Sequence, residues 1–391
     1  MLKAAVVGLG IGHAHCAAYL ASSYATLAAV CDPMPERLAR VSGTFAQGSM
    51  LDLQTLYPPE LLEKRWQDLG VETFNSLEEI LADESIRIIS LCTPDHTHAE
   101  LGARVLRSGR HLLLEKPLAV SLRGARHIGR ALAERGSRSL FSVGFEFRLN
   151  PAVLQVRELV RSGFTGEVEA FSLHHFRRPF KRDKWQHWIQ SRRFSGGLIV
   201  EETCHWFDLL RFLTGKEVEI LQCQSSDRID TDFDFEDVAY IQGRLAGGGV
   251  FQIAHALTGF DFHLVITVHG RRGTVWCQLK EQPQSRLDDG RSDYCALVAW
   301  GEPNRSPADA SSLTFGLEAT EPRNIRDYAQ HFVECVARGD APAVSYQDGL
   351  RALELSLLAR AAGEEGGERG PADLAALEAA EGKEGGVEAI S

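Results

Sequence analysis

The fold is decided by the stretch Val6-Val7-Gly8-Leu9-Gly10-Ile11-Gly12-His13-Ala14-His15, in which an apolar strand leads into glycines and then a helix. Glycines allow a tight turn and let the backbone approach a pyrophosphate, whose charge the following helix N-terminus attracts. The sequence therefore predicts a dinucleotide site at Gly8, Gly10, Ile11 and Gly12. The match to G-x-G-x-x-G is imperfect, because His13 stands at the third glycine, and an ordinary strand-to-helix turn is the alternative.

A carboxylate closes the next predicted strand, 24 residues after Gly8. Asp32 follows Val30 and Cys31. A carboxylate there can accept both ribose hydroxyls and would repel a 2′-phosphate, so it favours NAD over NADP. The alternative is that Asp32 caps a helix starting near Pro35.

Around this motif, residues 1–147 alternate strand-like and helix-like segments, which predicts a doubly wound parallel sheet of the Rossmann type. The expected strands are Lys3–Val7, Leu27–Cys31, Arg87–Cys92, His111–Leu114 and Ser139–Phe147. The expected helices are His13–Ser22, one opened by a capping box at Ser76 and ending near Ala82, Thr97–Leu106, and Leu122 to about Glu134.

Residues 148–362 have a different character and predict a second, α+β domain with antiparallel strands. Its expected β segments are Glu167–Phe176, Glu217–Gln224, Val238–Leu245, Val250–Leu257 and His263–Leu279, followed by helical runs around Ile325–Val336 and Tyr346–Ala362. Residues 363–391 form an acidic Gly/Glu-rich tail with too little apolar content to hold itself on a core, apart from a short helix at 372–380.

Composition excludes several classes of function. The chain carries a formal charge of −11, and its 44% hydrophobic content suits a globular enzyme. An acidic chain without a basic surface is not expected to bind nucleic acid, and no apolar run approaches the roughly 20 residues of a membrane span. The eight cysteines are scattered without a CxxC pair, so we expect reduced thiols, a cytoplasmic protein and no metal site.

Two further motifs distinguish this chain from other proteins with a dinucleotide-binding turn. They are Thr93-Pro94-Asp95-His96-Thr97-His98-Ala99-Glu100 and Glu115-Lys116-Pro117, with weaker matches at Arg148–Pro151 and Ser195–Asp208. With these the chain resembles the glucose–fructose oxidoreductase, inositol dehydrogenase and rhizopine catabolism (Gfo/Idh/MocA) family over essentially residues 1–362. The resemblance implies an N-terminal Rossmann domain and a C-terminal α+β domain, whose large open antiparallel sheet carries the substrate pocket and oligomer contacts.

The resemblance also implies cofactor and catalytic residues. NAD would be contacted by Thr93, Pro94, His96, Glu115 and Lys116. Lys116 would lie beside the nicotinamide and the reacting hydroxyl, His205 would accept the proton, and Glu201 stands at the family's aspartate.

This chemistry is reasonable in itself, because an imidazole titrates in the useful range, a carboxylate can orient it and an ammonium can polarise the hydroxyl. In a helix from Thr203, His205 and Asp208 would share one face with Glu201. Glu201 is one methylene longer than aspartate, which leaves Glu202 as an alternative partner of His205.

On the substrate side, the resemblance points to Arg148, Trp188 and Asp208. Each has a plainer alternative: Trp188 could pack in the core, and Asp208 could pair with Arg211. The basic run Arg177–Arg182 could hold an anionic substrate group or simply face solvent.

We therefore predict a cytoplasmic, homo-oligomeric (dimeric or tetrameric) NAD(P)-dependent dehydrogenase with NAD favoured. It would transfer a hydride between nicotinamide and a CH–OH carbon of a sugar, polyol or cyclitol. One alternative is a glycoside-cleaving relative that oxidises and re-reduces a retained NAD. Another is a ligand-sensing protein that keeps the fold without turnover.

Overall fold

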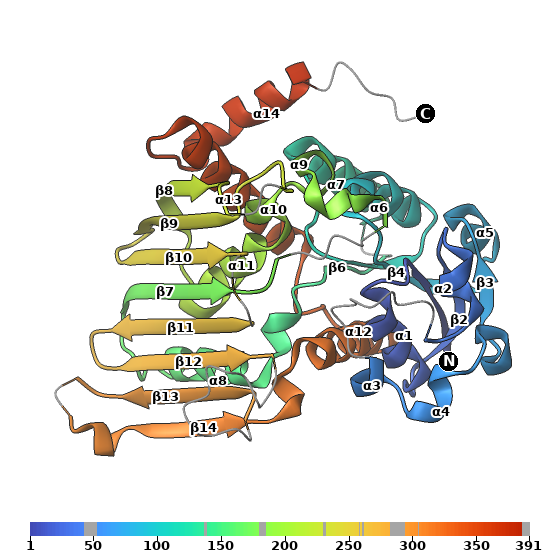
Figure 1. Ribbon diagram of the computed structural model, residues 1–391, viewed down its shortest axis with the longest axis horizontal. Helices are drawn as coiled ribbons and strands as arrows, with labels where there is room; N and C mark the ends of the chain where they lie inside the picture. The colour runs from blue at the N-terminus through green and yellow to red at the C-terminus, as the bar shows by residue number, and fades with distance from the viewer. Residues whose placement is uncertain are drawn as a thin grey trace.

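The computed structural model describes residues 1–391 except 43–52, 137–138, 180–184, 230–231, 258, 260–261, 282–293, 304 and 385–391. Two sheets form the framework, one on each side of the molecule, with helices between and around them (Figure 1). Within the described ranges, no helix combines the length and hydropathy that crossing a bilayer requires.

The first sheet has six parallel strands in the order β3-β2-β1-β4-β5-β6, which confirms the predicted Rossmann arrangement. Its strands are nearly continuous apolar runs because helices cover both faces. The strands are β1 (Leu2–Val7), β2 (Ala25–Cys31), β3 (Glu72–Phe74), β4 (Ile86–Leu91), β5 (His111–Leu114) and β6 (Phe141–Val143).

The helices in this half of the sequence are α1 (Gly12–Leu20), α2 (Pro35–Ala39), α3 (Leu53–Leu56), α4 (Pro59–Leu62), α5 (Leu77–Ala82), α6 (His98–Arg107) and α7 (Leu122–Arg135). The four helices expected here are present as α1, α5, α6 and α7, whereas α3 and α4 were not expected and α2 lies where the alternative interpretation of Asp32 put a helix. The capping box of α5 differs in detail, because the Ser76 hydroxyl donates to the Glu79 carboxylate at 2.8 Å rather than capping a backbone amide.

The second sheet has eight strands in the order β14-β13-β12-β11-β7-β10-β9-β8. It is antiparallel except where β7 and β10 run parallel. The strands are β7 (Val168–Phe176), β8 (Val218–Ser226), β9 (Val238–Leu245), β10 (Val250–Ala256), β11 (His263–Gly270), β12 (Thr274–Lys280), β13 (Ala296–Gly301) and β14 (Ser311–Phe315). The predicted segment His263–Leu279 is thus a hairpin, and β13 and β14 had no sequence prediction.

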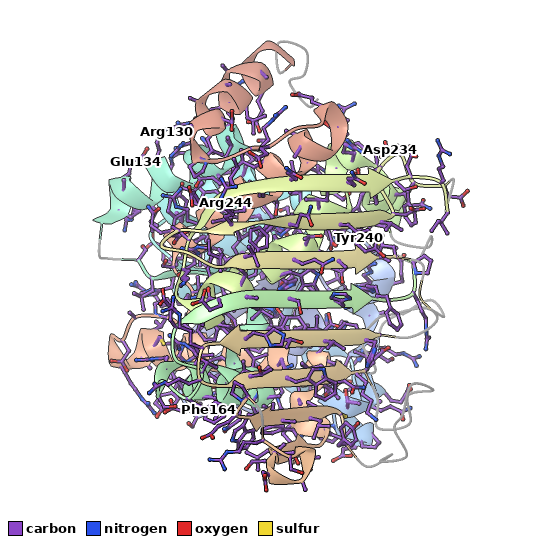
Figure 2. The ribbon with its side chains drawn as sticks, turned by 90° about the vertical axis from the view of Figure 1, so that its left-hand side faces the viewer. Arg130, Glu134, Phe164, Asp234, Tyr240 and Arg244 are labelled. Atoms are coloured by element: carbon purple, nitrogen blue, oxygen red, sulfur yellow. The ribbon has the colours of Figure 1, made fainter. Side chains whose placement is uncertain are left out.

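Helices cover one face of this sheet, and its other face turns outward (Figure 2). Tyr240 and Arg244 of β9 are exposed on that outer face. The remaining helices are α8 (Pro151–Arg161), α9 (Arg192–Ser195), α10 (Leu198–Glu201), α11 (Thr203–Thr214), α12 (Glu321–Arg338), α13 (Tyr346–Glu365) and α14 (Leu374–Glu384).

Late helices join the two halves. Ile325, Tyr328 and Phe332 of α12 are buried in the same apolar cluster as β1 and α1, beside which α12 lies (Figure 1). Helix α13 contributes leucines to the clusters of both sheets. The cleft side of the Rossmann sheet is therefore fixed to the second sheet by packed apolar side chains.

The short helix expected in the tail is present as α14, and the tail is held on the core by this helix and, contrary to expectation, also by residues before it. Leu374 and Leu377 of α14 pack against both apolar clusters, and Arg369 pairs with Leu221 of β8 through backbone hydrogen bonds. The Glu381 carboxylate accepts hydrogen bonds from the amides of Leu122 and Arg123 at the start of α7. Two leucines and a carboxylate that caps the start of α7 thus attach an otherwise polar segment to the rest of the protein.

Candidate active site

The glycine turn between β1 and α1 is shaped by close backbone contacts. Gly8 has φ +93°, and a Cβ there would lie 2.3 Å from the carbonyl oxygen of Cys92. A Cβ on Gly12 would lie 2.8 Å from Val6 Cγ1, so Gly12 lets α1 pack against β1, the role usually given to the third glycine. A Cβ on Gly10 would meet nothing within 4 Å.

His13, in the third glycine position, belongs to the core. It is fully buried, its Nδ1 lies 3.2 Å from the Tyr57 hydroxyl, and its ring packs against Trp66. Burial, with a smaller contribution from Arg37, lowers the pKa of His13 to about 3, so the imidazole is neutral. Of the two interpretations of His13, the structure supports the neutral core histidine rather than a phosphate contact.

Asp32 lies at the carboxyl end of β2, beside the glycine turn. Its Oδ2 accepts from the Leu9 amide at 2.8 Å and its Oδ1 from the Met34 amide at 2.9 Å. Arg37 Nη1 lies 3.2 Å from Oδ2. The carboxylate therefore ties the turn to β2 and has a cation next to it.

Two loops meet at the carboxyl ends of β4 and β5. His98 holds them together, with Nδ1 2.8 Å from the Pro117 carbonyl and Nε2 2.9 Å from the Thr93 carbonyl. The ring of His96 packs on Phe194 of α9, at 4.8 Å between centroids. The T-P-x-x-x-H and E-K-P motifs thus form one surface, which an element of the second half covers.

Glu115 is buried behind this surface. Its carboxylate lies 3.0 Å from His15 Nε2 and accepts from the backbone amide of Lys116 at 3.2 Å. A Cβ on Gly144 would come within 2.8 Å of the carboxylate, so that glycine leaves room for it. Glu115 therefore fixes the backbone that carries Lys116.

Lys116 reaches from the end of β5 to α10. Its Nζ donates to Glu201 Oε1 at 2.6 Å and to the Glu201 carbonyl at 3.1 Å. Burial by itself would lower the pKa of Lys116, but the carboxylates of Glu201 and Asp95 outweigh it, so the pKa lies above its ordinary value. The ammonium is therefore a stable cation.

His205 lies in α11 with its ring against Phe145 and Phe147, at 5.4 Å between centroids in each case. Its Nδ1 is buried, 3.9 Å from Glu146 Oε2, and forms no hydrogen bond with any residue that the structure describes. Burial first, and then the charge of Lys116, lower the pKa of His205 well below its ordinary value. The imidazole is neutral and is close enough to Lys116 to feel its charge.

The expected Glu201–His205 pair is corrected by this geometry. Glu201 ends α10, the backbone breaks at Glu202, and α11 begins at Thr203, so Glu201 is not on the helical face of His205. The carboxylate beside His205 is instead Glu146, whose pKa burial raises well above its ordinary value. The sequence analysis missed Glu146 because residues 139–147 were expected to continue as a strand, whereas β6 ends at Val143 and a 3₁₀ turn (Glu146–Leu149) follows.

Arg148 and Asp208, both expected on the substrate side, bind each other instead. Arg148 donates to both carboxylate oxygens of Asp208, at 2.8 and 2.6 Å, and its Nη2 also lies 2.9 Å from Asp348. Both side chains are buried. The alternative partner Arg211 binds Glu217. A buried charge requires a partner, and here each of the two satisfies the other.

Trp188 lies in a 3₁₀ turn (Trp185–Gln190) and packs against a small apolar cluster that contains Phe233 and Phe235. Its contacts support the alternative of core packing rather than the expected place on the substrate side. In the basic run, Arg177 donates to Glu202 Oε1 at 2.9 Å, and residues 180–182 lie outside the described part of the chain.

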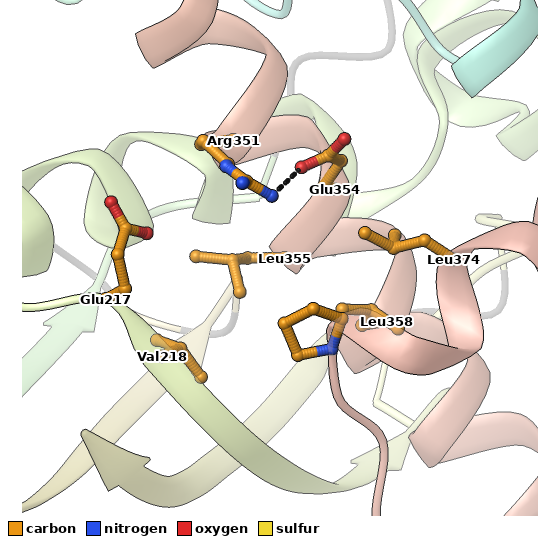
Figure 3. Close-up of a pocket in the computed structure, with 8 residues that line it drawn as sticks. Glu217, Val218, Arg351, Glu354, Leu355, Leu358 and Leu374 are labelled. Carbon is orange, nitrogen blue, oxygen red and sulfur yellow. Dashed lines mark hydrogen bonds and ion pairs between the residues drawn. The ribbon is translucent and has the colours of Figure 1, made fainter. Parts of the chain in front are cut away.

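A pocket elsewhere contains none of these residues. Figure 3 shows it between β8, α13 and the start of the C-terminal helix, with leucines on its walls and the Arg351–Glu354 ion pair at its rim. It lies where the start of the C-terminal helix packs near α13, and it has no part in the candidate active site.

All eight cysteines are buried and unpaired, as predicted. Burial raises the pKa of Cys204, which lies next to His205 in sequence, well above its ordinary value. A buried thiol of this kind is a weak nucleophile, so the candidate chemistry rests on the imidazole and the ammonium.

Comparison with known proteins agrees with this picture. A model described as "Oxidoreductase family, NAD-binding Rossmann fold" matches residues 2–145, and one described as "GFO/IDH/MocA C-terminal domain" matches residues 153–276. Inositol 2-dehydrogenase of Rhizobium meliloti is 25% identical over 357 residues, covering 90% of this chain and 93% of the relative. Myo-inositol 2-dehydrogenase of Thermotoga maritima is 26% identical over 342 residues, covering 84% and 95%. A solved levoglucosan dehydrogenase with NADH superposes with a TM-score of 0.75 at 17% identity, covering 94% and 98%.

Proposed function

Because the chain belongs to the Gfo/Idh/MocA oxidoreductase family and has its NAD-binding Rossmann domain, we propose that it is a dehydrogenase of sugars, polyols or cyclitols. It would transfer a hydride between nicotinamide and a CH–OH carbon. The observation that carries the proposal is the convergence of an ammonium and a neutral imidazole from the two halves of the chain, Lys116 from β5 and His205 from α11.

The glycine turn fits the cofactor. A Cβ on Gly10 would point into open space, where a pyrophosphate could approach, and α1 begins at Gly12 after Ile11, whose position has no side-chain cap. Uncapped N–H groups at a helix start favour an anion. Asp32 would accept the ribose hydroxyls, and bound NAD would supply the hydride acceptor.

The remaining roles follow from charge. His205 is neutral, so it can take the hydroxyl proton of the substrate as general base. Lys116 stays cationic, so it can stabilise the negative charge that develops on the substrate oxygen. Glu201 positions Lys116. Glu146 is the acidic group 3.9 Å from His205 Nδ1; burial raises its pKa and favours the neutral carboxyl, so it would stabilise a protonated His205 by giving up its own proton.

The inositol dehydrogenases among the relatives and the levoglucosan dehydrogenase among the solved structures make a cyclic polyol the first substrate to test. The full-length protein should be screened with inositols, sugars and sugar acids for NAD⁺ reduction, with His205→Asn as control. Accumulating NADH with wild type alone supports the proposal. Glycoside release without net NADH would favour the glycoside-cleaving alternative, and NAD binding without any turnover would favour the sensor.

The preference for NAD is a separate proposal that rests on Asp32. Arg37, 3.2 Å from its carboxylate, is a cation that a 2′-phosphate could use, so both cofactors should be compared. Asp32→Ala should weaken NAD binding tenfold or more, about 1.4 kcal/mol. It also removes the acceptor of the Leu9 and Met34 amides, so the unfolding midpoint should fall, and NAD is titrated well below that midpoint. Equal NAD affinity in the variant and wild type, measured by titration calorimetry, would remove this assignment.

A further inference from the structure

Three buried side chains near the candidate site converge without satisfying one another. His175 of β7 and His255 of β10 are register partners on neighbouring parallel strands, so their rings rise from the same face, 4.8 Å apart between centroids. Glu202, at the junction of α10 and α11, reaches down to both rings. The two imidazole side chains are 0% exposed and the carboxylate is 6% exposed.

The hydrogen bonds of the two Nδ1 atoms determine which nitrogen of each ring carries the proton. His175 Nδ1 lies 3.2 Å from the carbonyl of His263, which can only accept, so Nδ1 carries the proton. The Thr203 hydroxyl donates to the Leu198 carbonyl and therefore accepts from His255 Nδ1, 2.8 Å away. Both Nε2 atoms are then unprotonated acceptors, and both lie near the Glu202 carboxylate.

No donor among the described residues meets these atoms. His175 Nε2, His255 Nε2 and Glu202 Oε2 are buried without a hydrogen bond. Arg177 donates to the other carboxylate oxygen, Oε1, and leaves Oε2 without a donor. Three acceptors that converge in a buried space cost free energy unless a cation lies between them.

The separations suit a metal ion. His175 Nε2 lies 3.3 Å from Glu202 Oε1, and His255 Nε2 lies 3.7 Å from Oε2. Ligand atoms at about 2.0–2.1 Å from a tetrahedral ion are about 3.4 Å apart. One ligand atom from each residue lies within 4.8 Å of the others, so small side-chain rotations bring all three to bonding distance.

We propose that His175, His255 and Glu202 bind one divalent transition-metal ion of the zinc class. Two imidazoles and one carboxylate form a borderline-soft ligand set, which favours Zn²⁺ or a similar ion over Mg²⁺ or Ca²⁺. Three protein ligands leave one position of a four-coordinate ion for water or substrate. The site departs from our expectation of no metal, which rested on the cysteine spacing alone.

The site lies directly behind the candidate base. The ring of Trp206 is 4.7 Å from that of His175 and 5.7 Å from that of His205, between centroids. The ion would add positive charge close to Arg177 and Lys116, while the carboxylates of Glu201, Glu202 and Glu321 around them offset it. The ion would thereby also hold α11, which carries His205, against the sheet.

The test is metal binding by the full-length protein, read independently of catalysis. After dialysis against EDTA, Zn²⁺, Mn²⁺ and Co²⁺ are added in turn, unbound ion is removed and metal per chain is measured by mass spectrometry. We expect one tightly held Zn²⁺ per chain, and for Co²⁺ the visible bands of a four-coordinate ion. His255→Ala and Glu202→Gln should each weaken Zn²⁺ binding tenfold or more.

His269→Ala is the matched control, because His269 lies on the neighbouring strand β11 but is exposed beside Thr274. It should bind Zn²⁺ like wild type. Circular dichroism and NAD binding show that each variant is folded, and His175→Asn replaces any variant that is not. The proposal is overturned if wild type takes up none of the three ions, or if His255→Ala and Glu202→Gln bind Zn²⁺ as tightly as wild type does.

Discussion

At the residue scale, the imidazole of His205 lies among groups that oppose its protonation. Burial first and then Lys116 lower its pKa, whereas Glu202 acts in the other direction. A base works when it is neutral, and the neutral form predominates above the pKa. Because the pKa lies well below 6.5, kcat should stay flat through pH 6.5 and fall only in more acidic buffer.

The same residue gives a substitution test. His205→Asn keeps the size of the side chain but removes the proton acceptor, so kcat should fall by about 10²–10⁴ while NAD affinity stays within a factor of two or so. Glu146→Gln should lower kcat less, because it removes only the carboxylate 3.9 Å from Nδ1. An acid limb centred at or above pH 6.5 in wild type, or an unchanged kcat in His205→Asn, would contradict the assignment.

At the element scale, two glycines of the turn between β1 and α1 are expected to have different roles: Gly8 is required for the fold, and Gly10 is required for NAD binding. Gly8→Ala would place a Cβ against the Cys92 carbonyl at a φ of +93°, so it should destabilise the protein by about 1–3 kcal/mol. Gly10→Ala meets nothing, so its unfolding midpoint should match wild type, yet its methyl group points where a pyrophosphate would approach. Urea unfolding and NAD titration of both variants check this, and equal NAD affinity of Gly10→Ala and wild type would place the cofactor elsewhere.

The ion pair between Arg148 and Asp208 connects elements rather than binding substrate. It joins the 3₁₀ turn after β6 to α11, and the contact of Arg148 with Asp348 connects α13 as well. Asp208→Asn leaves a buried guanidinium with a weaker partner and should cost about 3–5 kcal/mol of unfolding free energy. Glu63→Gln, which breaks the exposed pair with Arg40, is the control and should cost about 1 kcal/mol or less. If Asp208→Asn loses no more unfolding free energy than the control, the structural role is contradicted, and a role of Arg148 and Asp208 in substrate binding is favoured again.

At the scale of the whole molecule, the eight-stranded sheet has an outer face that no helix of the described chain covers (Figure 2). Tyr240 of β9 and Val250 of β10 are 55% and 54% exposed on that face. Large apolar side chains exposed on neighbouring strands of an uncovered sheet favour an interaction surface. We expect a second copy of the chain to cover this face, in keeping with the predicted dimer or tetramer.

This assembly has a direct test. Tyr240→Glu puts a charge in the middle of the face and should shift the mass measured by light scattering toward the monomer, whereas Tyr240→Phe should leave it unchanged. The fold should survive, because Tyr240 is not part of either apolar cluster. A wild-type monomer, or an unchanged oligomer in Tyr240→Glu, would contradict the expectation.

Local patterns in the sequence were sufficient for the Rossmann sheet, the order of its helices and most of the second sheet. Alternating apolar runs, glycine turns and caps act over a few residues, and their physical meaning does not depend on the rest of the chain. They failed where elements are short or edge-like, as in β3, β13 and β14, and where apolar residues continue past a strand end, as at Glu146.

By itself the sequence indicated the dinucleotide turn and the family and led to the proposal of Lys116 and His205, because each depends on a local motif. Only the tertiary structure decided the partners: Glu201 for Lys116, Arg148 for Asp208, Glu146 for His205, and Glu202 for the two histidines of the second sheet. Most of these pairs lie tens of residues apart in the chain. A buried charge takes whichever opposite charge folding brings nearest, and sequence spacing carries no record of that choice.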